Sequence, residues 1–311
     1  MTMKIILPGG AGLVGQNLVN DLKLLGYMNV VVIDKHLENL KILKKIQPHI
    51  VSVHTDLSIP GSWQSHFKNA DIVVMLQAQI GGNDYDAFVR NTIDSTKLIL
   101  DLINRYKIPR LIHISSSVVN SFAEDFYTNT KKAQEALVVE NACACYILRP
   151  TLMFGWFDRK HLGWLARLMK KLPIFPIPGN GRYLRQPLYV RDFCMVIINC
   201  MKGHIKKGIY NISGQEKLDY INIIYELKFF NKIDTPIIKI PYFIFYLLLM
   251  IWECFDRDPP FTTKQLKALS AKDEFEVIDW PNIFGVPYTP FKLAMKETFT
   301  HPKYSKVILE F

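Results

Sequence analysis

Short apolar runs recur through the first half of the chain and alternate with longer segments whose apolar residues follow a helical spacing. Continuous apolar runs, without alternating polar positions, are typical of strands buried on both faces of a parallel sheet. Strands separated by segments long enough for helices predict a doubly wound α/β fold with a parallel sheet. The predicted strands are Lys4–Leu7, Val30–Asp34, Ile50–His54, Asp71–Leu76, Arg110–Ser115 and Cys145–Arg149.

The segments between these strands place apolar residues three and four positions apart, which predicts helices. Beyond residue 155 the composition changes, and a basic amphipathic stretch leads into a Pro/Gly-rich connector at 173–181. We expect a first domain at 1–155, with return segments at about 185–213. A smaller, mostly helical lobe is expected at 156–184 and 214–311. The predicted helices are Gln16–Leu25, Glu38–Ile46, Tyr85–Arg105, Tyr127–Glu140, Leu162–Leu172, Phe193–Met201, Tyr220–Phe230, Pro241–Trp252 and Lys264–Ser270, and a returning strand is predicted at Gly208–Ser213.

Composition and charge narrow the classes of partner. The chain has 311 residues and is 49% hydrophobic, which suits one large α/β domain with a small lobe. Its net charge is +10, from 38 Lys and Arg against 28 Asp and Glu, but the basic residues are scattered. Without a basic stripe and interleaved aromatics, no nucleic-acid partner is expected. The partners that the positive charge still fits are an anionic small substrate and an anionic membrane surface.

Cysteine usage and apolar segments bear on location. The five cysteines are odd in number and form no Cys-x-x-Cys motif, so we expect no metal site, no disulfide and a reducing, cytoplasmic location. The chain enters a predicted strand within four residues, so no signal peptide is expected. The uncharged run Ile240–Trp252 is too short to span a bilayer. It is either a buried or interface helix or a peripheral contact with the inner membrane face. The cysteines are Cys143, Cys145, Cys194, Cys200 and Cys254.

Three glycines, Gly9, Gly12 and Gly15, lie between the first predicted strand and the first predicted helix. A strand, a Gly-rich turn and a helix N-terminus bring several backbone N–H groups to one point, which suits a pyrophosphate. Leu13 and Val14, at the helix start, belong to the same predicted cofactor site. The motif alone is weak, and a Gly-rich turn without a ligand is the alternative.

Asp34 ends the second predicted strand, about twenty residues after the last glycine. A carboxylate there accepts hydrogen bonds from the adenosine ribose and repels a 2′-phosphate, so it favours NAD over NADP. The basic residues Lys35 and His36 follow directly and weaken this preference for NAD. The alternative role of Asp34 is to cap the end of the strand. Further cofactor-binding residues are predicted at other strand ends and nearby: Asp56, Leu57, Gln77, Ala78, Asn91, Ser115 and Pro150.

The fifth predicted strand ends in three serines, and Tyr127 and Lys131 follow about ten residues later. Tyrosine and lysine four residues apart share one helix face, and an ammonium beside a phenol lowers the phenol pKa from about 10. A nearby serine hydroxyl can bind the same substrate oxygen. This set is suited to moving a proton on or off a carbinol while hydride moves to a nicotinamide. A second such pair, Tyr288 and Lys292, spans Pro290, which opposes a helix, and is interpreted as chance.

Two arginines, Arg182 and Arg185, follow the Pro/Gly-rich connector. A guanidinium binds phosphate through two parallel hydrogen bonds, so the pair suits a diphosphate group. Solvated surface arginines are the alternative.

These motifs, in this order, resemble the extended short-chain dehydrogenases/reductases of the NAD-dependent epimerase/dehydratase superfamily. The resemblance implies a Rossmann NAD-binding domain and a C-terminal lobe for a nucleotide-diphosphate sugar, expected to be UDP-linked. It places the catalytic serine on Ser116, with Ser117 second and assigned to the substrate. Tyr127 becomes the acid/base, Lys131 holds the nicotinamide ribose and Arg185 meets the diphosphate. A homodimer through the helices at 85–105 and 127–140 is the habit of the family.

The departures from the family pattern leave three functions open. No Asp-Glu pair follows the serines, as sugar 4,6-dehydratases require, so dehydration is disfavoured. A 4-epimerase is favoured, and a net 4-keto reductase or dehydrogenase is the alternative. The segments 257–262 and 265–269 also resemble the complex I accessory branch, so a non-catalytic dinucleotide-binding protein is the third candidate.

Overall fold

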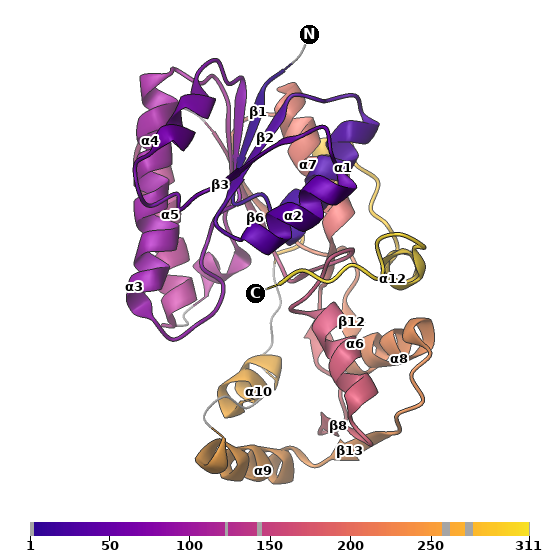
Figure 1. The fold of residues 1–311 in the computed structure, drawn as a ribbon. Helices are drawn as coiled ribbons and strands as arrows, with labels where there is room; N and C mark the ends of the chain where they lie inside the picture. The colour runs from indigo at the N-terminus through magenta and orange to yellow at the C-terminus, as the bar shows by residue number, and fades with distance from the viewer. Residues whose placement is uncertain (1–2, 122–123, 142–144, 257–261, 271–275, 311) are drawn as a thin grey trace.

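A seven-stranded sheet forms the centre of the computed structural model, which describes residues 3–121, 124–141, 145–256, 262–270 and 276–310 (Figure 1). The strand order is β11-β6-β5-β4-β1-β2-β3, and every pairing in the sheet is parallel. The expected Rossmann-type, doubly wound α/β fold is confirmed, with a largely helical C-terminal part. The strands are β1 (Ile5–Pro8), β2 (Val30–Asp34), β3 (Val51–His54), β4 (Ile72–Met75), β5 (Leu111–Ile114), β6 (Tyr146–Pro150) and β11 (Gly208–Ile212).

Helices cover both faces of this sheet (Figure 1). Successive strand residues point to opposite faces, so Ile5 and Leu7 enter one core and Ile6 enters the other. Both faces are therefore apolar, which is why the strands read as continuous apolar runs. The first face packs on α1 (Leu13–Leu24), α2 (Leu37–Ile46) and α7 (Val190–Lys202), and the second on η1 (Ser62–Phe67), α4 (Ser95–Arg105) and α5 (Phe126–Asn141).

The helix predicted at 85–105 is interrupted. It consists of α3 (Tyr85–Phe88), one π-helical segment, η2 (Val89–Asp94), and α4. The Ser95 and Thr96 hydroxyls donate to the carbonyls of Asn91 and Thr92, at 2.8 and 2.6 Å. Such back-bonding loosens a helical turn, and the apolar spacing gives no sign of it.

The C-terminal part has its own apolar core between α6 (Leu162–Lys171), α8 (Tyr220–Asn231) and α12 (Phe291–Thr300). The connector at 173–181 is not entirely a loop, because it contains a strand, β8 (Phe175–Pro178), paired with β13 (Ile237–Ile240). Its prolines fit a two-stranded edge, where one side of the strand needs no partner. The other short strands are β7 (Met153–Phe154), β9 (Leu184–Arg185), β10 (Leu188–Tyr189) and β12 (Leu218–Asp219).

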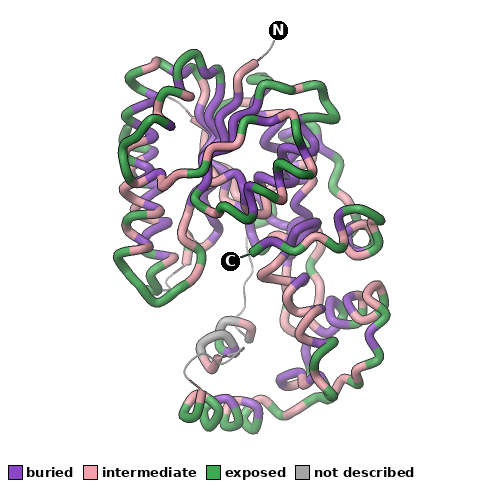
Figure 2. Tube along the Cα trace, viewed as in Figure 1, coloured by how far each residue is buried: buried purple, intermediate pink, exposed green. Residues whose placement is uncertain are grey.

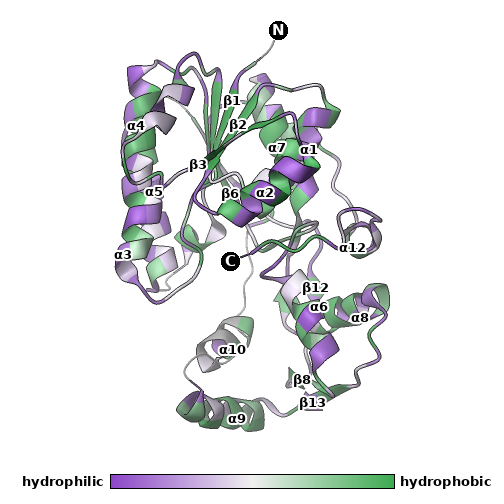
Figure 3. Cartoon of the chain, viewed as in Figure 1, coloured by the Kyte–Doolittle hydropathy of each residue, from purple (hydrophilic) through white to green (hydrophobic). Residues whose placement is uncertain are grey.

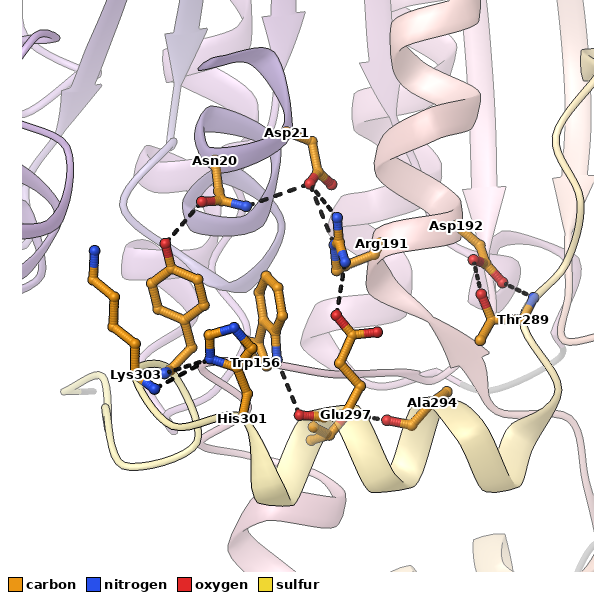
Figure 4. A network of polar contacts seen from close by, with 12 residues as sticks. Asn20, Asp21, Trp156, Arg191, Asp192, Thr289, Ala294, Glu297, His301 and Lys303 are labelled. Carbon is orange, nitrogen blue, oxygen red and sulfur yellow. Dashed lines mark hydrogen bonds and ion pairs between the residues drawn. The ribbon is translucent and has the colours of Figure 1, made fainter. Parts of the chain in front are cut away.

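The C-terminal residues return to the Rossmann domain. Helix α11 (Trp280–Phe284) buries both of its terminal aromatic rings in the core beside α7. Arg191 of α7 then bridges Asp21 of α1, at 2.8 Å, and Glu297 of α12, at 2.7 Å (Figure 4). Parts of 276–310 therefore stabilise the first domain, although the sequence groups them with the second lobe.

Helices α9 (Tyr242–Phe255) and α10 (Thr263–Ser270) lie apart from the two cores of the sheet and from the core of the C-terminal part. They are at the end of the molecule remote from the sheet (Figure 1). Their contact is a small cluster of Phe245, Leu249 and Leu266. Within the described part of the chain, no helix is long and apolar enough to cross a membrane. Cys143 and most of the segment 257–262 lie outside the described residues.

Candidate active site

The Gly-rich turn joins β1 to α1 with very little space. Gly9 has a φ of +74°, and a Cβ there would lie 2.5 Å from the backbone of Gln77. A Cβ on Gly15 would lie 2.1 Å from the Gly10 carbonyl oxygen. Gly12 differs, because its Cβ would meet only open space and one atom at 3.9 Å. It precedes α1 without a side chain to cap the first turn, so the turn fits the pyrophosphate of a dinucleotide.

Asp34 lies at the carboxyl end of β2 and is buried. Its carboxylate accepts a hydrogen bond from the Ala11 N–H at 2.9 Å and one from the His36 N–H at 3.0 Å. The carboxylate is thus held against the Gly-rich turn, at the edge expected for an adenosine ribose. Arg159, which follows β7, lies close enough for Asp34 to oppose the lowering of its pKa by burial. Sequence gave no signal for this arginine, because it comes from a distant loop.

Ser116 and Tyr127 meet at the carboxyl end of β5. Ser116 is buried and caps a short 3₁₀ turn, η3 (Ser117–Asn120), where its Oγ accepts from the Val118 N–H at 3.4 Å. Its side chain also lies close enough to the phenol of Tyr127 to affect the pKa of that phenol. Burial raises the pKa of Tyr127, the Ser116 side chain opposes this, and the Asp125 carboxylate adds to the rise. The sequence predicts that Lys131 lowers the pKa of Tyr127, but the pKa is raised because burial outweighs the other effects. The surroundings of Tyr127 therefore favour its protonated phenol.

Lys131 is almost fully buried on the same helix, α5. Its Nζ donates to the Ile114 carbonyl at 2.9 Å and to Gln134 Oε1 at 2.5 Å. Burial lowers the pKa of Lys131 to about 7, although the Glu135 carboxylate opposes the change. Burial therefore favours the neutral amine of Lys131.

We expect this buried amine to make stability depend on pH. The lysine pKa is about 10.4 in an unfolded chain, so between pH 7 and 10 the unfolded state binds more protons and the free energy of unfolding rises with pH. The slope from this one group is at most about 1.4 kcal/mol per pH unit. Urea unfolding from pH 7 to 9 should show Lys131→Met removing that slope and Lys132→Met keeping it. An unchanged slope in Lys131→Met would show that the folded protein keeps the amine charged.

A second polar group lies one turn further along α5 and was missed by sequence reasoning. Glu135 accepts a hydrogen bond from the Ser115 hydroxyl at 2.5 Å and forms an ion pair with Arg149 of β6. It thereby fixes the start of the serine run. The spacing of Glu135 four residues after Lys131 was the available signal, since both lie on one helix face. Arg149 could be found only from the fold.

Gln77 and Asn91 take part in hydrogen bonds around this site. Gln77 Nε2 donates to the Thr96 hydroxyl at 3.2 Å, and Asn91 donates to Gln79 Oε1 at 2.8 Å. Asp56 lies in a turn and accepts from the Ser58 N–H and hydroxyl at 2.8 and 2.7 Å. Burial alone would raise the pKa of Asp56, but these bonds outweigh it and the pKa is lowered. Four other predicted residues, Leu57, Ser115, Ser117 and Pro150, are buried, and three, Leu13, Val14 and Ala78, are half-buried.

The two predicted diphosphate ligands lie in the second lobe. Arg182 is exposed, and its backbone N–H donates to Asn180 Oδ1 at 2.9 Å. Arg185 lies on β9, where its guanidinium donates to the Leu184 carbonyl at 2.7 Å and to the Leu269 carbonyl of α10. The structure therefore ties Arg185 to α10, in the second lobe.

The Gly-rich turn, Asp34 and the Ser116–Tyr127–Lys131 group all lie at the carboxyl ends of parallel strands. Ligands bind at this edge of doubly wound sheets. In the described part of the chain, no group of three His, Cys, Asp or Glu side chains is placed to hold a metal ion. Fold and site together define a dinucleotide-binding Rossmann protein with the residues of a short-chain dehydrogenase/reductase.

Comparison with known proteins gives the family. Residues 5–213 match the NAD dependent epimerase/dehydratase family, and the chain belongs to it. A curated relative is a mitochondrial NADH dehydrogenase 1 alpha subcomplex subunit 9 from Dictyostelium discoideum, 23% identical over 83% of this chain and 73% of that protein. A dTDP-glucose 4,6-dehydratase from an Actinoplanes strain is 25% identical over 68% of this chain and 77% of the dehydratase chain.

Solved structures share the fold at low identity. UDP-glucose 4-epimerase from Thermotoga maritima superposes with a TM-score of 0.73 and 17% identity, covering 96% of this chain and 98% of its own. UDP-glucuronic acid 4-epimerase from Bacillus cereus, in complex with NAD, superposes with a TM-score of 0.68 and 20% identity, again covering 96% of this chain and 98% of that chain. The cofactor of the family is NAD, and the open turn at Gly12 and the carboxylate of Asp34 fit it.

Proposed function

We propose that the protein is an NAD-dependent 4-epimerase of a nucleotide-diphosphate sugar, with UDP as the expected nucleotide. The placement of Ser116 and Tyr127 together at the carboxyl end of β5 carries this proposal, because the same sheet edge holds the Gly-rich turn. The family and the 4-epimerases among the structural neighbours support it.

Bound NAD supplies the acceptor and donor of hydride. Once its own proton has been lost to solvent, Tyr127 acts as the phenolate and takes the proton of the sugar C4 hydroxyl as hydride leaves C4, and Ser116 orients that oxygen. Because burial raises the pKa of Tyr127, a cation beside the phenol is needed to stabilise the phenolate. Lys131 is one helical turn away and fills that role once it is charged. Arg185 and Arg182 hold the diphosphate while the 4-keto sugar turns, and Tyr127 returns the proton.

Incubation with UDP-sugars tests the proposal against net redox chemistry. An epimerase forms the C4 epimer without added cofactor and without a net change in nicotinamide absorbance at about 340 nm. A net reductase or dehydrogenase consumes or produces NADH in proportion to product. No reaction across a broad panel of sugar nucleotides, in protein that binds NAD, would contradict both.

A second candidate is a dinucleotide-binding protein without turnover, favoured by the relative from the NADH dehydrogenase alpha subcomplex. The proximity of Ser116 to Tyr127 and the buried Lys131 argue for the enzyme, because a binding protein has no use for an acid/base pair. Mass analysis of ligands released by denaturation separates the two: NAD with a UDP-sugar supports the enzyme, and NAD alone supports the binding protein.

Two further features belong to the proposal. We place the enzyme in the cytoplasm, where free cysteines stay reduced. We also propose a homodimer through α4 and α5, the helices that cover one face of the sheet. Light scattering of the purified protein tests the second point, and a mass of one chain would contradict it.

A further inference from the structure

Helix α9 presents an apolar surface that the proposed active site does not use. Glu253 is the one charged residue among its fourteen. Its carboxylate faces α10, where it accepts hydrogen bonds from the Thr263 N–H at 2.5 Å and hydroxyl at 3.0 Å. Phe245 and Leu249 face α10 as well. The helix therefore keeps its charge and its buried residues on one side.

The opposite side of α9 is entirely uncharged. At about 100° per residue, its large exposed side chains cover roughly half of the helix circumference. Their exposed fractions run from 39% at Leu247 to 88% at Phe255. Figure 3 shows the hydrophobic colour along this helix, and Figure 2 shows how much of it is exposed. We call this surface the apolar arc: Phe243, Ile244, Leu247, Leu248, Met250, Ile251, Trp252 and Phe255.

The width of the apolar arc indicates what covers it. A helix packed against one partner needs an apolar stripe little wider than about 100°. The arc is about twice as wide, so one partner helix would leave much of it in water. The acyl region of a bilayer surface covers such an arc completely.

Basic side chains lie on the elements that lead into α9 or pack beside it. Lys170 and Lys171 end α6 and lead into β8, whose partner strand β13 carries Lys239 just before α9. On the other side, Lys267 of α10 stands over the ring of Tyr246, with 5.6 Å to the centroid. All four lysines are exposed. One acid, Asp256, lies at the end of the helix and accepts from the Trp252 indole at 3.2 Å. Among the described residues on these elements, the exposed charge is thus mainly positive and complements anionic lipid headgroups.

We propose that the apolar arc of α9 docks in the plane of an anionic bilayer surface, with the flanking lysines on the headgroups. The helix is about 21 Å long, too short to cross a bilayer but suited to lie within one leaflet. Arg185 is bonded to the Leu269 carbonyl of α10, so docking holds the predicted diphosphate-binding segment close to the membrane surface. This inference does not depend on turnover.

Co-sedimentation of the full chain with vesicles tests the proposal. Wild type is expected to sediment with vesicles of phosphatidylcholine and phosphatidylglycerol, and more weakly with phosphatidylcholine alone. Phe243→Ser with Leu247→Ser should weaken binding to both by about 100-fold, since each change removes a large apolar side chain from the interface. Changing Lys170, Lys171 and Lys239 to Gln should cost about fivefold per lysine, and only on anionic vesicles.

A matched control changes the same residue types elsewhere. Phe229 of α8 and Leu293 of α12 are also exposed, at 69% and 58%, and their double Ser variant should bind vesicles like wild type. Thermal melting checks that both double variants are folded. The proposal fails if folded wild type stays in the supernatant, or if the control loses binding as the α9 variant does. It also fails if the apolar arc of α9 joins two copies of the chain instead. In that case wild type would be a dimer that does not bind vesicles, and the α9 variant would be a monomer.

Discussion

Phenylalanine in place of Tyr127 is expected to lower kcat for epimerisation by about 10²–10⁴-fold, the usual contribution of a general acid/base. The change removes only the hydroxyl that lies near Ser116 and keeps the ring. Affinity for NAD should stay within about threefold, because the phenol is assigned to the sugar oxygen. Kinetics with a UDP-sugar and calorimetric titration of NAD measure the two effects separately.

The second Tyr-x-x-x-Lys pair provides the control. Tyr288 precedes α12 and Pro290 caps that helix, so Tyr288 and Lys292 do not share a helix face. Tyr288 is also exposed. Tyr288→Phe should therefore keep wild-type kcat. A Tyr127→Phe enzyme that kept more than about a tenth of wild-type activity would show that another group moves the proton.

Alanine at Gly15 is expected to cost at least about 3 kcal/mol of folding free energy, at the upper end for overpacking. Its Cβ would stand 2.1 Å from the Gly10 carbonyl oxygen, and backbone on both sides leaves no side chain free to move away. The turn and the start of α1 would have to separate, so NAD binding should be lost as well. Urea unfolding followed by circular dichroism measures the change.

Gly12→Ala separates binding from folding at the same turn. Open space surrounds the Cβ position of Gly12, so unfolding should shift by less than about 1 kcal/mol. If the pyrophosphate lies against this backbone, the methyl group weakens NAD binding at least tenfold. Equal NAD affinity in Gly12→Ala and wild type would place the cofactor elsewhere.

Much of the fold was predictable because local pattern and tertiary context agree. β2 was predicted with the bounds that the structure shows, since all five of its residues are buried. β8 was not, because its prolines oppose a strand and only the distant β13 makes it one. The π-helical segment at 89–94 was also hidden, because hydroxyl back-bonds rather than apolar spacing produce it.

The candidate site was predictable in its residues but not in its electrostatics. Spacing pointed to Tyr127 and Lys131, the family resemblance pointed to Ser116, and the structure places Ser116 near Tyr127. Spacing could not show that Lys131 would be buried against Gln134, nor that burial would raise the Tyr127 pKa. Burial depends on how α5 packs on the sheet, which a periodic pattern does not specify.

One measurement tests the central claim most directly. The purified protein is incubated, without added cofactor, with a UDP-sugar that carries deuterium at C4. A 4-epimerase that returns hydride to the sugar predicts a mixture of both C4 epimers, each retaining deuterium at C4, with no net NADH. Product without deuterium at C4, stoichiometric NADH, or no epimer from any UDP-sugar would contradict the account.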